Sequence, residues 1–139
     1  MELARRGAVV VTGGLGGAME AACRGAKRGG GTTIGILPGH HRAAANEWVD
    51  VAVPTGLGEG RNALVVRAAD ALIAVAGEFG TLSEIALALK LGRPVVGLAT
   101  WELARDGRPV GAIVSAATPA EAAETAITLA TRRAPPPGS

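Results

Sequence analysis

Short apolar runs rich in β-branched residues recur along the chain and alternate with segments of helical composition. Runs of this length without polar residues are typical of strands that are buried on both faces. The runs lie at residues 8–11, 32–37, 49–53, 71–75, 94–98 and 112–115, and the helical segments lie at 1–6, 18–28, 61–69, 82–91 and 118–131. This alternation predicts a three-layer, Rossmann-like α/β fold, with a doubly wound, mostly parallel sheet and helices on both faces.

The length of the chain and the composition of its end predict the domain organisation. A chain of 139 residues with 48% hydrophobic residues is expected to form one globular domain, which we assign to residues 1–131. Residues 132–139 are rich in proline and are expected to form a flexible tail. The helix at 82–91 is apolar almost all round, so beyond covering the sheet it either meets a second subunit or is buried within the chain.

Composition argues against several classes of protein. The net charge of +2, with interspersed signs, leaves no basic stripe for nucleic acid. We find no signal peptide and no apolar run near the roughly 18–20 residues of a membrane span. The single cysteine, Cys23, is expected to be a small buried residue. Because one cysteine cannot form a disulfide within the chain, it fits a reducing compartment, and a cytoplasmic protein is expected. His40 and His41 lack further ligands at a suitable spacing, so no metal site is predicted. Both are expected on the surface, and a contact of one of them with a ligand is the alternative.

The stretch GEFGTLSE, residues 77–84, joins a predicted strand to a predicted helix through a glycine turn. Such a turn leaves backbone N–H groups without intrahelical partners, and the helix dipole adds partial positive charge. A phosphate or carboxylate is the natural occupant, so Gly77, Gly80 and Thr81 are predicted to bind an anion. The alternative is a tight turn between strand and helix that binds nothing.

A second glycine turn follows the first predicted strand and contains Gly13, Gly14, Gly16 and Gly17. Its spacing matches neither the dinucleotide fingerprint nor the P-loop. We interpret it as a second backbone surface for the ligand, with Met19 packed nearby, and close packing of helix on strand is the alternative. Because both turns follow parallel strands, both are expected at the carboxyl edge of the sheet, where such folds bind ligands.

Three further polar residues are candidates for the site. Glu84 either bonds back to Thr81 in a capping box or faces the ligand. Arg61 is either a solvated arginine at a helix start or a fork of donors that contacts the ligand and keeps Glu84 ionised. Asn62 is either a polar contact beside it or a surface residue.

These motifs together resemble a known family. GEFGTLSE is similar to the PGGxGTxxE motif of the Lonely Guy family, also called lysine decarboxylase-like, and the spacing of Arg61 and Glu84 matches the catalytic arginine and glutamate of that family. The stretch VVTGGLGGAMEAACRGA resembles its first glycine turn. The stretches ANEWVDVAVPTGLGEGRNALVVRAADALIAV and GTLSEIALALKLGRPVVGL resemble its molybdenum-cofactor-carrier-like branch.

The resemblance implies a Rossmann-type fold, usually as a homodimer or a larger homo-oligomer. Lonely Guy members hydrolyse the N-glycosidic bond of nucleoside 5′-monophosphates, and this would make Arg61 and Glu84 catalytic. Carrier members bind molybdenum cofactor, a phosphorylated pterin, and have no known chemistry. The sequence therefore predicts a phosphorylated small molecule as partner, without a required cofactor. Three hypotheses about the function stay open. The protein is a phosphoribohydrolase, a non-enzymatic carrier of molybdenum cofactor or another phosphorylated ligand, or a module that has lost its site.

The chain departs from the family pattern in three places. Glu78 replaces the second glycine of the motif, and its carboxylate would repel a phosphate unless it points away. Ala76 replaces the proline, which is expected to change only the rigidity of the turn. The opening strand of the family and most of its first helix would precede Met1, and without them two strand edges and an apolar face are expected to be exposed. A misassigned start, a partner chain in that slot and an adjusted fold are the alternatives.

Overall fold

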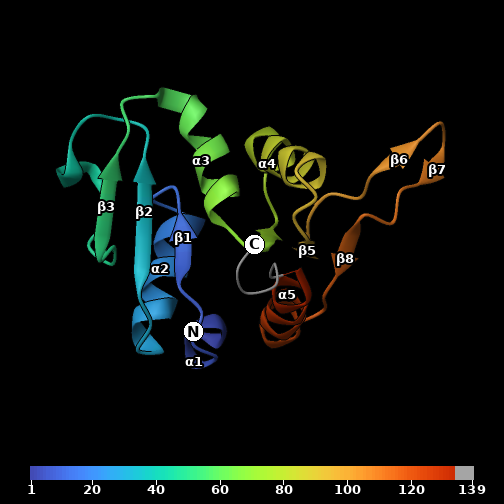
Figure 1. The fold of residues 1–139 in the computed structure, drawn as a ribbon, viewed down its shortest axis with the longest axis horizontal. Helices are drawn as coiled ribbons and strands as arrows, with labels where there is room; N and C mark the ends of the chain where they lie inside the picture. The colour runs from blue at the N-terminus through green and yellow to red at the C-terminus, as the bar shows by residue number, and fades with distance from the viewer. Residues whose placement is uncertain (134–139) are drawn as a thin grey trace, which may run out of the picture. The chain divides into compact units, whose positions relative to one another are not determined.

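The computed structural model describes residues 1–133 and divides into two compact units, Met1–Ala68 and the chain from Ala69 onward (Figure 1). Each unit is built on a parallel three-stranded sheet with helices packed on it. The predicted α/β fold class is therefore confirmed. The assignment of residues 1–131 to a single domain stays a prediction, and residues 134–139 of the predicted tail lie outside the described part of the chain.

The N-terminal unit contains three strands that alternate with helices, as the apolar runs predict. Its elements are α1 (Glu2–Arg5), β1 (Val10–Thr12), α2 (Ala18–Arg28), β2 (Thr33–Leu37), η1 (Arg42–Ala44), β3 (Val51–Pro54), η2 (Gly58–Gly60) and α3 (Arg61–Ala68). The strands are parallel in the order β1-β2-β3. Three successive residues at the end of β2, Gly35, Ile36 and Leu37, are buried. Because successive side chains point to opposite faces, both faces of this strand are covered.

The C-terminal unit repeats this construction. Its elements are β4 (Leu72–Val75), α4 (Phe79–Lys90), β5 (Val95–Leu98), β6 (Ala104–Arg105), β7 (Arg108–Pro109), β8 (Ile113–Ser115) and α5 (Pro119–Arg133). The parallel strands lie in the order β4-β5-β8. Val95 and Val96 are 1% and 0% exposed, so this central strand is also covered on both faces. Val96 packs with Ala122 and Ala126 of α5.

Two helices in the C-terminal unit differ in length from the prediction. Helix α4 begins at Phe79, within the glycine turn, instead of at residue 82. Helix α5 continues to Arg133, so the first two residues of the predicted tail are helical. Its start agrees with the sequence pattern, because Thr118 Oγ1 accepts a hydrogen bond from the N–H of Glu121 at 3.2 Å.

A β-hairpin of β6 and β7 was not predicted from the sequence. Asp106 and Gly107 connect the two strands and have φ values of +50° and +70°. Two positive φ values in a two-residue connection fit a type I′ turn, for which Asp-Gly is a favoured pair. The dipeptide was therefore a usable signal, although the strands are too short to show an alternating pattern.

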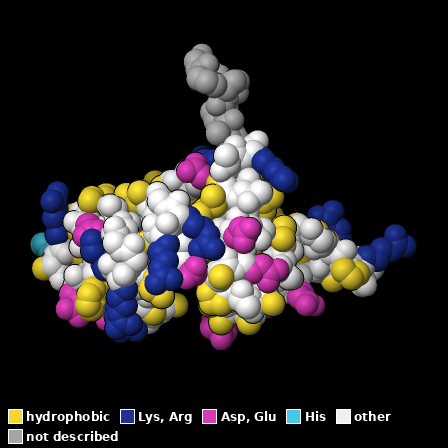
Figure 2. All heavy atoms as spheres, turned by 90° about the horizontal axis from the view of Figure 1, so that it is seen from below, with side chains coloured by type: hydrophobic (Ala, Val, Ile, Leu, Met, Phe, Trp, Pro, Cys, Tyr) yellow, Lys and Arg dark blue, Asp and Glu magenta, His cyan; other side chains and the backbone are white. Residues whose placement is uncertain are grey.

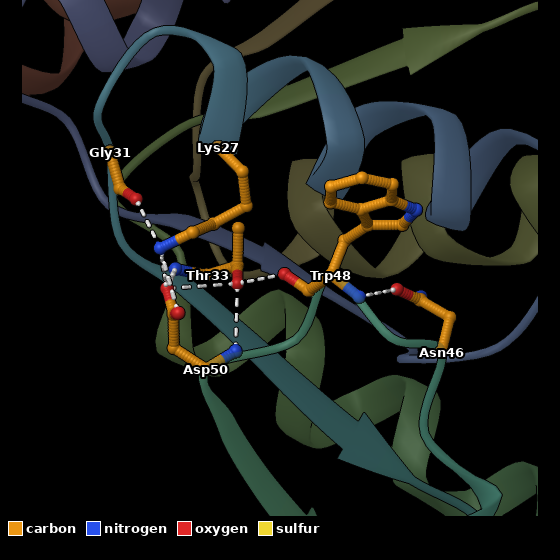
Figure 3. Close-up of polar contacts among 6 residues, drawn as sticks. All are labelled: Lys27, Gly31, Thr33, Asn46, Trp48 and Asp50. Atoms are coloured by element: carbon orange, nitrogen blue, oxygen red, sulfur yellow. Dashed lines mark hydrogen bonds and ion pairs between the residues drawn. The ribbon is translucent and has the colours of Figure 1, made fainter.

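An ion pair links the end of α2 to the start of β3 (Figure 3). Lys27 Nζ lies 2.7 Å and 2.9 Å from the carboxylate oxygens of Asp50. The same carboxylate accepts the backbone N–H of Thr33 at 2.9 Å and its hydroxyl at 3.2 Å. The hydrogen bond from Lys27, followed by the one from the Thr33 backbone, holds the pKa of Asp50 below its ordinary value of 3.8.

The surface carries both signs of charge. Lys and Arg side chains lie beside Asp and Glu side chains on the face that Figure 2 shows, as the nearly balanced composition predicts. Within residues 1–133, no helix is both long enough and apolar enough to cross a membrane.

We predict that Asp50→Asn lowers the free energy of unfolding at pH 7. We also predict that this free energy depends less on pH in the acid range for the variant than for wild type. A carboxyl with a lowered pKa in the folded state stabilises the protein above its ordinary pKa, and this contribution disappears as pH falls through the folded value. Below about pH 4, the free energy of unfolding of the wild-type protein should therefore fall more steeply than that of the variant. Urea unfolding at a series of pH values measures both slopes, with Glu102→Gln as an exposed-carboxylate control. Equal slopes for wild type and Asp50→Asn would contradict the prediction.

Candidate functional site

The first glycine turn leaves the end of β1 and leads into α2. Thr12 Oγ1, at the end of the strand, accepts a hydrogen bond from the N–H of Gly14 at 3.0 Å. Gly14 and Gly17 have φ values of +76° and +66°, a region in which glycine is unstrained. Gly13 and Gly14 are buried, whereas Gly16 and Gly17 are exposed. The turn therefore presents its second half to the surface at the start of α2.

Arg61, the first residue of α3, lies directly over this turn. A methyl group built on Gly13 would lie 1.8 Å from Arg61 Nη1 and 2.7 Å from Met19 Sδ. Only glycine leaves room there for both side chains. The structure thus brings Arg61 to Gly13 and Met19, which the sequence analysis had already placed near each other.

Arg61 is buried, and one nitrogen of its guanidinium has no hydrogen-bond partner among residues 1–133. The residue is only 9% exposed, and its Nε makes no hydrogen bond within the described part of the chain. A buried charge is unfavourable unless it is paired and hydrogen-bonded. The alternative of a solvated arginine is therefore excluded, whereas the role of Arg61 toward a ligand stays a prediction. Asn62 follows it in α3 and is half-buried.

The second glycine turn follows β4 and enters α4. Gly77 has a φ of +99°, and a methyl group on it would lie 2.3 Å from Thr81 Oγ1. Gly77 and Thr81 are therefore in close contact. A methyl group on Gly80 would meet nothing within 4 Å, so packing inside the protein does not require glycine at that position.

The carbonyl groups of this turn are held by a segment that follows β5. Thr100 Oγ1 donates a hydrogen bond to the carbonyl of Ala76, and Trp101 Nε1 donates one to the carbonyl of Glu78 at 3.2 Å. Ala76 has a φ of +48°, which a proline ring cannot adopt. The prediction that Ala76 changes only the rigidity of the turn is therefore wrong, since the backbone takes a path that excludes proline.

Glu84 does not belong to a capping box at the start of α4. The residue that precedes the helix is Glu78, whose side chain makes no capping hydrogen bond. Thr81 is the third residue of the helix and Glu84 the sixth. Glu84 is half-buried in the second turn of α4. Its assignment as a catalytic residue stays a prediction.

Two aromatic residues meet beside the second glycine turn. The ring centroids of Phe79 and Trp101 are 5.6 Å apart, and their planes are inclined by 39°. Phe79 is 75% exposed, whereas Trp101 is half-buried with its indole N–H directed to Glu78. The pair offers an apolar ring surface next to the turn, of a kind that suits a planar ligand ring.

The cysteine and the two histidines have the burial and the exposure that the sequence predicts. Cys23 is completely buried, with its Sγ 3.4 Å from Thr12 Oγ1, and His40 and His41 are exposed. The part of the chain that the structure describes contains no group of three or more His, Cys, Asp or Glu side chains that could hold a metal ion.

Sequence reasoning missed the residues that hold the carbonyl groups of the two turns. Asn46 donates to the carbonyls of Gly14 and Leu15, as Thr100 and Trp101 do to those of the second turn. Each lies in a loop far along the chain from the turn that it contacts. No spacing rule pointed to them, because their partners are backbone atoms that carry no sequence signature.

The sequence profile of the SLOG cluster4 family matches residues 1–131. The chain belongs to the SLOG cluster4 family. This confirms the predicted relationship to Lonely Guy-type proteins. Among curated proteins, the SLOG cluster4 chain is 46% identical over 96 residues to an uncharacterised protein of Archaeoglobus fulgidus. That alignment covers 69% of this chain but only 63% of the relative.

Solved structures similar to this SLOG cluster4 chain identify the branch. The molybdenum cofactor binding protein from Rippkaea orientalis is 33% identical, with a TM-score of 0.75 over 92% of this chain and 83% of that structure. The Moco carrier protein from Chlamydomonas reinhardtii is 37% identical, with a TM-score of 0.80 over 94% of this chain and 82% of that structure. The predicted resemblance to the carrier-like branch is confirmed.

We predict that Gly14→Ala destabilises the protein by about 1–3 kcal/mol, as overpacking does. The new methyl group would lie 2.7 Å from Leu37 Cδ2 and 3.1 Å from the backbone of Gly35, at a strained positive φ. Gly16→Ala is the matched control, because nothing lies within 4 Å of its added methyl group. Its free energy of unfolding should stay within about 0.5 kcal/mol of wild type. Urea unfolding measures both, and equal stabilities would overturn this account of the turn.

Proposed function

We propose that the protein binds a phosphorylated, ring-bearing small molecule without changing it, and that Arg61 and the glycine turn at 13–17 hold the phosphate. The observation that carries this proposal is the buried guanidinium of Arg61, whose Nε lacks a partner within residues 1–133. A phosphate offers the charge and the planar pairs of acceptors that a guanidinium fork prefers. Binding would convert an unfavourable buried charge into a paired one.

The space around the glycines supports this proposal. Methyl groups on Gly16 and Gly80 would meet nothing within 4 Å. Neither residue has a positive φ, so neither packing nor backbone conformation within the protein explains glycine there. Glycine at these two positions would allow a ligand to approach the backbone closely. This agrees with the ligand-binding role predicted for each turn.

Molybdenum cofactor is the first candidate ligand. The proteins from Rippkaea orientalis and Chlamydomonas reinhardtii, which bind or carry this cofactor by their descriptions, are similar over more than nine tenths of this chain. A phosphorylated pterin supplies a phosphate for Arg61 and the glycine turn at 13–17. We also propose that the protein is a homo-oligomer and that it is located in the cytoplasm, as the sequence predicts.

A second candidate function is hydrolysis of the N-glycosidic bond of a nucleoside 5′-monophosphate. The observation that favours it is the position of Glu84, which lies in the second turn of α4 and not in a capping box. A carboxylate in such a site would stabilise the positive charge that develops on the ribose ring and orient the attacking water.

We predict that Arg61→Met has opposite effects on binding and on stability. Loss of the guanidinium should weaken binding of AMP and inorganic phosphate by about tenfold or more, as expected for charged hydrogen bonds. Without ligand, the variant should be at least as stable as wild type, by up to about 1 kcal/mol, because an unpaired buried charge is removed. Calorimetric titration and urea unfolding measure the two effects.

Arg67→Met is the matched control for Arg61→Met, since Arg67 is exposed on the same helix. It should leave the dissociation constants for AMP and phosphate within about twofold of wild type, since an exposed charge contributes little. Wild-type protein expressed with active cofactor synthesis should also carry pterin fluorescence, which Arg61→Met should lose. Equal binding by wild type and Arg61→Met would remove the proposed phosphate site.

We predict that, if the second candidate function holds, Glu84→Gln slows the release of adenine from AMP by about a hundredfold or more, the range of general acid–base effects. Chromatography of the incubation mixture measures free adenine. Glu124→Gln, an exposed carboxylate on α5, is the control and should keep the wild-type rate. If wild-type protein releases no more adenine than Glu84→Gln, hydrolysis is excluded and the binding function alone stands.

A further inference from the structure

Asn46 uses its polar atoms to hold the first glycine turn. Its backbone N–H donates to the carbonyl of Gly14 at 2.9 Å. Its Nδ2 donates to the carbonyl of Leu15 at 2.9 Å and to that of Gly14 at 3.3 Å. Its Oδ1 accepts the N–H of Trp48 at 3.0 Å, which fixes the orientation of the amide (Figure 3).

This contact determines which side of the turn can receive an anion. In a trans peptide group, the C=O and the following N–H point in opposite directions. Since Asn46 draws the carbonyls of Gly14 and Leu15 toward itself, the N–H groups of Leu15 and Gly16 point away from it. A phosphate is attracted by such N–H groups and repelled by carbonyl oxygens.

We propose that Asn46 is a positioning residue of the phosphate site: it sets the peptide orientation of the turn without touching the ligand. This inference rests on the proposed function, because an anion must bind at the turn for its orientation to matter. It adds a residue from the loop before β3 to a site otherwise built from the turn and from α3.

Residues 46–50, which we call the strap, are attached at two places that can be separated by mutation. Asn46 holds the glycine turn that precedes α2, whereas Asp50 pairs with Lys27 in the last turn of α2. Between them, the carbonyl of Trp48 accepts the hydroxyl of Thr33 at 2.6 Å (Figure 3). A variant at the Lys27 end therefore weakens the strap without touching the peptide groups of the turn.

Two substitutions of Asn46 distinguish orientation from packing. Asn46→Asp has nearly the same shape but replaces the Nδ2 donor by an acceptor, which repels the carbonyls of Gly14 and Leu15. Asn46→Ala removes the donor without adding repulsion. Because Asp also adds a negative charge that repels an anion, the neutral Ala variant decides. A role in packing alone leaves its affinity for phosphate near the wild-type value, whereas a role in orienting the peptide groups lowers that affinity and the amide shifts of Leu15 and Gly16.

The experiment titrates inorganic phosphate and AMP into wild type, Asn46→Asp, Asn46→Ala and Lys27→Met, well below the melting temperature of each. Asn46→Asp is expected to weaken binding of both by about tenfold or more, and Asn46→Ala by less, in line with hydrogen bonds to charged groups. Lys27→Met is expected to lower the melting temperature but to bind within about twofold of wild type. In NMR spectra, phosphate should shift the amide signals of Leu15 and Gly16 in wild type, and much less in Asn46→Asp.

The possible failures are distinguishable. If wild type binds phosphate and Arg61→Met does not, but Asn46→Asp binds as well as wild type, the role of Asn46 is wrong and the proposed function stands. If Asn46→Asp and Lys27→Met weaken binding equally, Asn46 contributes only to the stability of the fold and the proposal is overturned. If wild type binds neither phosphate nor AMP, the proposed function fails and this inference fails with it. Should Asn46→Asp not fold, Asn46→Ala with its amide shifts decides between the same outcomes.

Discussion

The burial of a positive charge, that of Arg61, is the constraint on which the first glycine turn of the N-terminal unit depends. Arg61 lies over Gly13, and its Nε finds no hydrogen-bond partner among residues 1–133. A protein that needed only packing at this position would place an apolar side chain there and avoid the desolvation cost. Retaining a guanidinium makes sense when a bound anion completes the arrangement. The glycine beneath it follows from the same constraint, since any side chain at Gly13 would displace the charge.

The two glycine turns use similar chemistry with different residues. Each follows a parallel strand and enters a helix, and each has its carbonyl groups bonded by side chains from a distant loop. In the first turn the donor is an amide, Asn46, and in the second the donors are Thr100 and Trp101. Holding the oxygens turns the N–H groups away from these donors, which favours negatively charged ligands. The aromatic pair beside the second turn adds a surface for rings to that chemistry.

Membership of the SLOG cluster4 family agrees with the order of these elements. The two departures from the Lonely Guy motif at the second glycine turn, Ala76 and Glu78, are neighbours in this part of the chain. Ala76 adopts a backbone conformation closed to proline, and Glu78 precedes α4 with its carbonyl bonded to Trp101. The similarity to molybdenum cofactor binding and carrier proteins extends over more than nine tenths of the chain. The proposed binding role therefore agrees with both the descriptions of these proteins and the buried arginine.

The fold class and most elements could be predicted from the amino-acid sequence, because short apolar runs and helical periodicity are local signals. Helix α2 at Ala18–Arg28, for example, agrees with the prediction to the residue. The two glycine turns could also be predicted, because glycine is favoured where the backbone takes a positive φ or a side chain approaches closely. The burial of Arg61 over Gly13, and the hydrogen bonds from Asn46 and Trp101 to the two turns, could be seen only in the folded protein. Those contacts join residues far apart in the chain, often through backbone atoms, and such pairings depend on how the chain folds back, which no local pattern specifies.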